Sequence, residues 1–167
     1  MTLSEAKQLI SSPSLPTDQN QQWADLGCGD GLFSKALLTI LPEGSIVHAI
    51  DQTQQTFSEP NIEFHRLNFE KDNLELPLPN GILMANSLHF IKDKSSLLRR
   101  LKDNLLSGCS FILIEYDLAT SNRWVPYPLK IEAAINLFTE VGFGSIRKIG
   151  ERKSVFNNTT MYSLHIQ

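Results

Sequence analysis

The sequence has few of the features that mark secreted, metal-binding or membrane proteins. Its 167 residues include only two cysteines, Cys28 and Cys109, which are far apart and form no Cys-x-x-Cys pattern. We therefore expect neither a disulfide framework nor a metal site. The N-terminal region contains no apolar run long enough for a signal peptide or a membrane span. Together these absences predict a protein of the reducing cytoplasm.

An excess of basic residues is also missing. The chain has 15 lysines and arginines against 18 acidic residues, a formal net charge of −3, so we expect no nucleic-acid partner. Arg99, Arg100 and Lys102 are interpreted as the solvated face of a helix. A hydrophobic content of 41% and a charged content of 20% are typical of a globular protein with a sizeable core. We predict a single domain over residues 1–167.

The most informative stretch that is present is a glycine-rich turn between a short apolar segment and an amphipathic helix. Gly27, Gly29 and Gly31 occupy alternate positions of this turn, and Asp25 lies just before it. Glycine lets the backbone approach a ligand closely because no Cβ stands in the way. The helix that follows directs its free N–H groups and the positive end of its dipole at the turn. This arrangement predicts a site for a nucleoside-bearing ligand at the carboxyl end of a parallel strand.

The spacing of the glycines distinguishes between two classes of ligand. A dinucleotide fingerprint requires Gly-x-Gly-x-x-Gly, and Leu32 stands at its third glycine position, which disfavours a nicotinamide-dependent oxidoreductase. A second acid, Asp51, ends the next apolar segment. The stretch Asp25-Leu-Gly-Cys-Gly-Asp-Gly31, together with Asp51, resembles the first motif of the class I S-adenosylmethionine-dependent methyltransferases.

Hydrophobic patterning predicts strands that alternate with helices. A strand is expected before the glycine turn, and further strands are expected at 46–50, 62–66, 81–85, 109–116, 146–149 and 160–167. Helices are expected at 4–10, 32–41, 95–106 and 129–141. Residues 52–60 leave room for one or two helical turns. No helix separates the last two strands, so they are expected to pair antiparallel.

These elements, with the resemblance, predict a Rossmann-like, doubly wound α/β fold. Its seven-stranded sheet is expected to be mostly parallel with an antiparallel last strand. Residues 1–21 form an N-terminal helix and loop in this scheme, and residues 22–167 form the core. Thr2 and Glu5 are spaced like a capping box for the first helix.

The resemblance also implies which residues bind S-adenosylmethionine around the glycine turn. Gly27 and Gly29 would let the backbone touch the methionine portion, and backbone groups around Cys28 would hold nearby atoms. Asp25 would hold the α-ammonium group, and Asp51 would accept both ribose hydroxyls. The alternatives are structural: Asp25 would then cap the turn, and Asp51 would be an exposed strand end.

The adenine end of the site departs from the family pattern. Gln52 would border the adenosine. The family usually has an acid after the third strand, where this chain has Asn68, whose amide oxygen can still accept a hydrogen bond from the adenine amino group. The N–H of Phe69 would donate to the adenine ring, and the backbone carbonyl of Asn86 would face the methionine ammonium.

Methyl transfer itself demands little from side chains, because positioning and the exclusion of water supply much of the acceleration. His89 is a weak candidate for a general base, by its place after the fourth predicted strand and by the intrinsic titration range of histidine. The alternative is that His89 is a hydrogen-bonded wall. His48, His65 and His165 fall inside predicted strands and are interpreted as structural.

Recognition of the methyl acceptor is expected from Tyr116, Asp117 and the loop that carries Trp124 and Tyr127. An aromatic loop stiffened by proline can roof a small pocket, although these rings could equally pack the last helix. The sequence Ser87-Leu-His-Phe90 is similar to the small-molecule branch that includes quinone-ring methyltransferases. No Asn-Pro-Pro-Tyr or Asp-Pro-Pro-Tyr motif follows the fourth strand, which counts against nucleic-acid bases as acceptors.

We therefore expect a minimal class I methyltransferase that transfers the methyl group of S-adenosylmethionine to a small molecule by in-line displacement. The chain lacks the large helical cover of many relatives, so its pocket is either shallow or completed by a second subunit in a homodimer. The main alternative is a cofactor-binding module or accessory subunit without catalytic activity.

Overall fold

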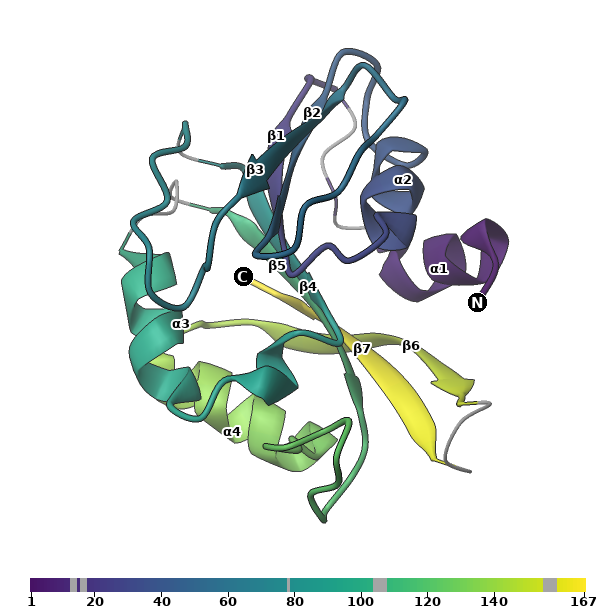
Figure 1. The fold of residues 1–167 in the computed structure, drawn as a ribbon. Helices are drawn as coiled ribbons and strands as arrows, with labels where there is room; N and C mark the ends of the chain where they lie inside the picture. The colour runs from purple at the N-terminus through teal and green to yellow at the C-terminus, as the bar shows by residue number, and fades with distance from the viewer. Residues whose placement is uncertain (13–14, 16–17, 78, 104–107, 155–158) are drawn as a thin grey trace.

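The computed structural model describes residues 1–12, 15, 18–77, 79–103, 108–154 and 159–167. In this part of the chain a single sheet runs through the middle of the molecule, with helices on both of its faces (Figure 1). The seven strands are β1 (Gln22–Leu26), β2 (Ile46–Asp51), β3 (Ile62–Arg66), β4 (Gly81–Ala85), β5 (Ser110–Tyr116), β6 (Ile146–Lys153) and β7 (Thr160–Ile166).

The order of the strands is β3-β2-β1-β4-β5-β7-β6. The first five strands are parallel to one another, and β7 runs antiparallel to both of its neighbours, β5 and β6. The predicted α/β fold with an antiparallel last strand is therefore confirmed. The chain reverses its direction of winding between β1 and β4, and in such sheets this switch point leaves a crevice at the carboxyl ends of the strands.

Two hydrophobic clusters hold the layers together, one on each face of the sheet. Helices α1 (Leu3–Ile10) and α2 (Leu32–Leu38) lie together on one face, while α3 (Lys94–Lys102) and α4 (Ile131–Val141) cover the other (Figure 1). The inner strands are mainly apolar because side chains on both faces are buried, and the carboxyl groups of Asp25 in β1 and Glu115 in β5 are exceptions. A capping box of Thr2 and Glu5 starts α1, as predicted.

The helices differ from their predicted bounds at several ends. Gly31 is the N-cap of α2, and the Asp30 carboxylate accepts a hydrogen bond from the Leu32 N–H (3.3 Å). Helix α2 ends at Leu38, three residues earlier than expected. Asp93 caps α3 by accepting from the Ser96 N–H, and the predicted end of this helix at 104–106 lies outside the described residues.

The crossover between β2 and β3 contains no helix, although residues 52–60 leave room for one or two turns. This segment is polar, so it has no apolar stripe with which a helix could pack on the sheet. It is held instead by two side-chain contacts. Phe57 packs against Phe64 with ring centroids 6.0 Å apart, and Glu59 forms an ion pair with Lys35 (3.1 Å).

No helix in the described part of the chain combines the length and the apolar character that a membrane span needs.

Gly81 of β4 packs so closely against Trp23 of β1 that a methyl group added at Gly81 is expected to destabilise the fold. A Cβ at Gly81 would lie 2.5 Å from the indole of Trp23, which is fully buried and fixed by a hydrogen bond to Gln21 (2.8 Å). Gly81→Ala is therefore expected to lower the free energy of unfolding by about 1–3 kcal/mol, the usual range for overpacking. Denaturant unfolding measures this change.

Gly144→Ala is the matched control, because a Cβ there has no neighbour within 4 Å. Equal stability of the two variants would contradict the packing described for Gly81.

Candidate functional site

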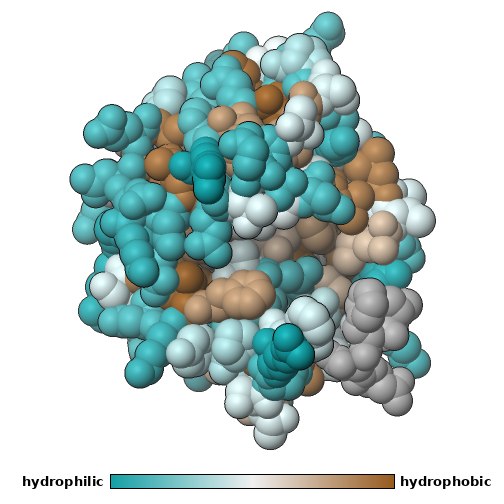
Figure 2. Space-filling view, in the orientation of Figure 1, coloured by the Kyte–Doolittle hydropathy of each residue, from teal (hydrophilic) through white to brown (hydrophobic). Residues whose placement is uncertain are grey.

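A cavity of about 640 Å³ lies at the carboxyl ends of β1, β2 and β4. Its volume falls within the usual range for small-molecule sites. The space-filling view shows the molecule hollowed near the middle of this face, where apolar surface borders a mainly hydrophilic exterior (Figure 2). The lining comes from the glycine turn, the end of β2, the segment after β3, the end of β4 and the short helix η1 (Leu88–Phe90), with Tyr116 from β5.

Eight of the nine residues predicted to bind the cofactor line this cavity, and the ninth does not. The eight are Gly27, Cys28, Gly29, Asp51, Gln52, Asn68, Phe69 and Asn86. Asp25 is fully buried behind the turn. The elements that carry these residues are far apart in sequence, so the parallel sheet is what brings them together.

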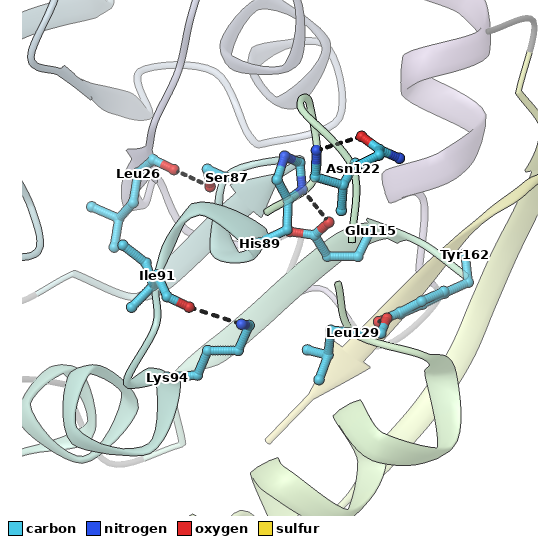
Figure 3. A network of polar contacts seen from close by, with 10 residues as sticks. Leu26, Ser87, His89, Ile91, Lys94, Glu115, Asn122, Leu129 and Tyr162 are labelled. Carbon is cyan, nitrogen blue, oxygen red and sulfur yellow. Dashed lines mark hydrogen bonds and ion pairs between the residues drawn. The ribbon is translucent and has the colours of Figure 1, made fainter. Parts of the chain in front are cut away.

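The glycine turn is tied to the neighbouring strand by its own backbone. The N–H groups of Gly27 and Cys28 both donate to the carbonyl of Ile50, at 2.8 and 3.0 Å. Gly27 has a φ of 80° and would place a Cβ 2.5 Å from the Cβ of Ser87, so only glycine fits here. Ser87 is fixed in turn by donating its hydroxyl to the Leu26 carbonyl at 2.6 Å (Figure 3).

Asp51 joins the end of β2 to the middle of the turn. Its Oδ2 accepts from the Gly29 N–H at 3.0 Å, and its Oδ1 accepts from the Thr53 N–H at 2.8 Å. Each carboxylate oxygen has a second lone pair, so Asp51 can accept further hydrogen bonds from a ligand in the cavity. The side chain therefore holds the turn and also offers a recognition group.

Asp25 has an unusual environment for a carboxyl group. Its Oδ2 accepts from the Ser34 hydroxyl at 2.5 Å, while its Oδ1 is buried without a hydrogen-bond partner. Burial raises the pKa of Asp25 from 3.8 to about 7, against the opposing effect of the Ser34 hydrogen bond. Burial likewise raises the pKa of the Cys28 thiol, with a further contribution from the charges of Asp25 and Asp51, so this cysteine stays protonated.

The far end of the cavity is formed by the segment that follows β3. The Asn68 side chain is already engaged, because its Oδ1 accepts from the Glu70 N–H (3.0 Å) and its Nδ2 lies 3.5 Å from Gln52 Oε1. Arg100 of α3 donates to the carbonyls of Phe69 and Glu70 and so holds this segment in place. The expectation that Arg100 is only a solvated charge is therefore wrong.

Asn86 supplies an unpaired acceptor at the end of β4. It has a φ of 56°, uncommon for a residue other than glycine, and its backbone N–H donates to the Ile114 carbonyl at 2.9 Å. Its Oδ1 is buried, belongs to a residue that lines the cavity and has no hydrogen-bond partner. A ligand with an N–H or ammonium group near this atom would satisfy it.

A buried histidine–carboxylate pair lies directly behind the cavity wall. His89 Nδ1 is 2.6 Å from Glu115 Oε2, and the His89 backbone N–H donates to Oε1 of the same carboxylate at 3.0 Å (Figure 3). Both residues are almost fully buried. His89 itself does not line the cavity, but the rings of its neighbours Phe90 and Tyr116 do, at centroid distances of 4.4 and 6.0 Å from the imidazole.

Of the four residues predicted to contact the methyl acceptor, only Tyr116 lines the cavity. Asp117 accepts from the Ile131 N–H at 3.2 Å and so caps the start of α4. Trp124 and Tyr127 are 71% and 40% exposed, and the Tyr127 N–H donates to the His89 carbonyl at 3.0 Å. Both rings therefore lie on the surface outside the cavity lining, and Tyr127 contacts His89 through its backbone.

Sequence reasoning did not identify several residues of the site. Leu67, Ser87, Phe90 and Ile91 line the cavity, and Glu115 pairs with His89. Only Glu115 had a visible signal: it is the one acid within the apolar run Cys109–Tyr116. An acid in a buried strand needs a partner, and this could have directed attention to the nearby histidine.

The fold of this chain is similar to the folds of three solved structures. Human N-acetylserotonin methyltransferase in complex with S-adenosylmethionine matches over 87% of this chain and 47% of its own, with 20% identity and a TM-score of 0.66. The CurJ carbon methyltransferase matches over 92% and 50%, with 17% identity and a TM-score of 0.68. An S-adenosylmethionine-dependent methyltransferase from Mesorhizobium loti matches over 99% and 95%, with 14% identity and a TM-score of 0.66.

The chain therefore has the Rossmann-like fold found in S-adenosylmethionine-dependent methyltransferases. It spans about half the length of the first two of these proteins. No protein-family model matches the sequence, and no curated sequence is similar to it.

The raised pKa of Asp25 predicts that stability falls as the pH rises. Between the ordinary pKa of 3.8 and the folded-state pKa of about 7, the folded chain binds one proton more than the unfolded chain at this position. The free energy of unfolding should therefore decrease by about 1.4 kcal/mol per pH unit in this window because of Asp25. Asp25→Asn cannot ionise and is expected to remove this contribution.

Denaturant unfolding at a series of pH values between about 4 and 7 measures the slope. The exposed Asp18 supplies the control variant Asp18→Asn, which should keep the slope of the unaltered chain. The same slope in Asp25→Asn would show that the carboxyl group titrates normally.

Proposed function

We propose that this protein binds S-adenosylmethionine and transfers its methyl group to a small-molecule acceptor. The observation that carries the proposal is the cavity at the switch point of the sheet, where the Asp51 carboxylate and the glycine turn meet. The fold shared with S-adenosylmethionine-dependent methyltransferases supports it. The net charge of −3 also favours a small acceptor over a nucleic acid.

The residues around the cavity fit this cofactor. Asp51 has free lone pairs for the two ribose hydroxyls. The methionine end of the ligand carries an ammonium group, which suits the unpaired Oδ1 of Asn86. Asp25 lies behind the turn, so its negative charge would act on this ammonium group across the turn and not by direct contact. Gly27 and Gly29 leave their surface open to the ligand, since a Cβ at Gly29 would meet nothing within 4 Å.

When bound, the cofactor supplies an electrophilic methyl group on a sulfonium. The chain has to place an acceptor in line with that group and exclude water from it. Phe90 and Tyr116 provide an apolar wall for this purpose. Trp124 and Tyr127 are exposed and do not line the cavity, so they would roof it only after a movement of their loop. A flat, partly apolar acceptor fits these rings best.

His89 and Glu115 have the arrangement of a general base with its orienting partner. Because the Glu115 carboxylate accepts from Nδ1–H, the imidazole keeps a lone pair on Nε2 that can take a proton. His89 lies behind the wall formed by Phe90 and Tyr116, so an acceptor reaches this nitrogen only when one of these rings moves aside. Glu115 would stabilise the resulting imidazolium, so removal of the acceptor proton becomes easier as the methyl group is transferred. We therefore assign His89 as the proposed base and Glu115 as a positioning residue.

The first test is binding of S-adenosylhomocysteine, followed by calorimetry. Asp51→Ala removes a charged acceptor of hydrogen bonds and is expected to weaken binding by about 1.5–3 kcal/mol. The exposed Asp18→Ala is the control and should leave the dissociation constant unchanged. No detectable binding to the unaltered chain at millimolar ligand would refute the proposed cofactor.

The second test separates catalysis from binding. His89→Gln keeps an N–H that can donate to Glu115 but cannot take up a proton, so kcat should fall by about 10²–10⁴-fold with an unchanged affinity for S-adenosylhomocysteine. Release of S-adenosylhomocysteine with a panel of small acceptors measures kcat. An unchanged kcat would show that His89 has only a structural role. Binding without turnover of any acceptor would favour the alternative, a module without catalytic activity.

A further inference from the structure

Three side chains of the kinds that bind metals converge on the sheet away from the cavity. His48 comes from β2, and Glu63 and His65 come from the edge strand β3, whose register sets Glu63 opposite His48. His48 Nδ1 lies 3.1 Å from His65 Nε2 and 3.4 Å from Glu63 Oε2. None of the three lines the proposed cofactor site.

These separations match the geometry of a tetrahedral metal site. Zinc binds imidazole nitrogen and carboxylate oxygen at about 2.0–2.2 Å, which places two ligand atoms of a tetrahedron about 3.3–3.6 Å apart. The two distances from His48 Nδ1 are within a few tenths of an ångström of this range. All three candidate ligand atoms lie within 4.8 Å of one another, close enough to share one ion after small side-chain adjustments.

A fourth side chain orients His48 for this role. Gln22 of β1 places its Oε1 3.1 Å from His48 Nε2, so it accepts the Nε2–H. The hydrogen bond fixes the tautomer in which Nδ1 carries a lone pair, and it is the kind of outer contact that metal-binding histidines usually make. Without a cation, this lone pair and the Glu63 carboxylate face each other as two acceptors, with only the Nε2–H of His65 available to one of them.

We propose that His48, Glu63 and His65 bind a divalent transition-metal ion of the zinc type. The Glu63 side chain is 52% exposed, whereas that of His48 is 4% exposed, so the ion approaches from the Glu63 side and a water molecule completes the tetrahedron there. Two histidines and one carboxylate favour Zn²⁺ over the hard cations Mg²⁺ and Ca²⁺, which prefer oxygen ligands.

A bound ion would join β3 to β2 at the open edge of the sheet. The chain leaves β3 at Arg66 and enters the wall of the cavity at Leu67, only two residues after His65. An ion that fixes β3 therefore also restrains this wall. Neither a metal site nor a role for His48 and His65 beyond a structural one was expected from the sequence, because only the pairing of β2 with β3 brings the two histidines together.

The test is a calorimetric titration of the chelator-treated full chain with ZnCl₂. We expect one equivalent of Zn²⁺ per chain and a rise in the unfolding temperature when the ion is present. Loss of an outer contact to a metal-binding histidine usually lowers affinity by about 10–100-fold, so Gln22→Leu should weaken binding to this extent and His65→Ala by more. The visible spectrum of Co²⁺ bound in the same site should be that of a tetrahedral complex.

Glu63→Gln and Glu140→Gln form a matched pair of exposed carboxylates. The first should weaken Zn²⁺ binding, and the second, on α4, should not. Circular dichroism of each variant establishes that it is folded. The proposal is overturned if the unaltered chain binds no Zn²⁺ at millimolar concentration, or if His65→Ala and Glu63→Gln bind it as tightly as the unaltered chain.

Discussion

The candidate site depends on the contact between the end of β2 and the glycine turn after β1. The Ile50 carbonyl accepts two N–H groups from the turn, and the Asp51 carboxylate accepts a third from Gly29. These bonds set the distance between the Asp51 carboxylate and the backbone of the glycine turn, the two groups that the proposed cofactor would bridge. Two of the three bonds join backbone groups and follow from the parallel pairing of β1 with β2, whereas the third depends on the Asp51 side chain.

The structure also contains two buried carboxyl groups, Glu115 and Asp25. Their hydrogen-bond partners determine how readily each one ionises and what role it can have. Glu115 has two hydrogen bonds from His89 and is fully satisfied in the core. Asp25 has only the Ser34 hydroxyl, so its proton affinity rises and its second oxygen is left without a partner. The first arrangement suits an orienting group for a base, whereas the second suits a group that ionises when a cation comes near.

Much of the fold could be predicted from the sequence, because apolar runs and turn residues report local structure. The strands and the antiparallel finish followed from such patterns. The cavity position of Asp51 and Asn86 was implied by the resemblance to the methyltransferases. The His89–Glu115 pair and the hydrogen bond from Arg100 to the Phe69 carbonyl could not be predicted. Each joins residues about 26 to 31 positions apart and depends on the direction in which a side chain points. Sequence spacing fixes which strand a residue occupies, but strand order and register decide which neighbour it meets.

The position of β7 between β5 and β6 has a consequence for how the molecule is assembled. Strand β6 pairs with β7, its neighbour in the sequence, whereas β7 must also pair with the distant β5, which joins Phe111 to Ile166. Closing such a long loop is entropically unfavourable and slows folding. Until that step, β5 presents an open edge that could pair with another chain, so nascent or partly unfolded molecules are exposed to aggregation along this strand.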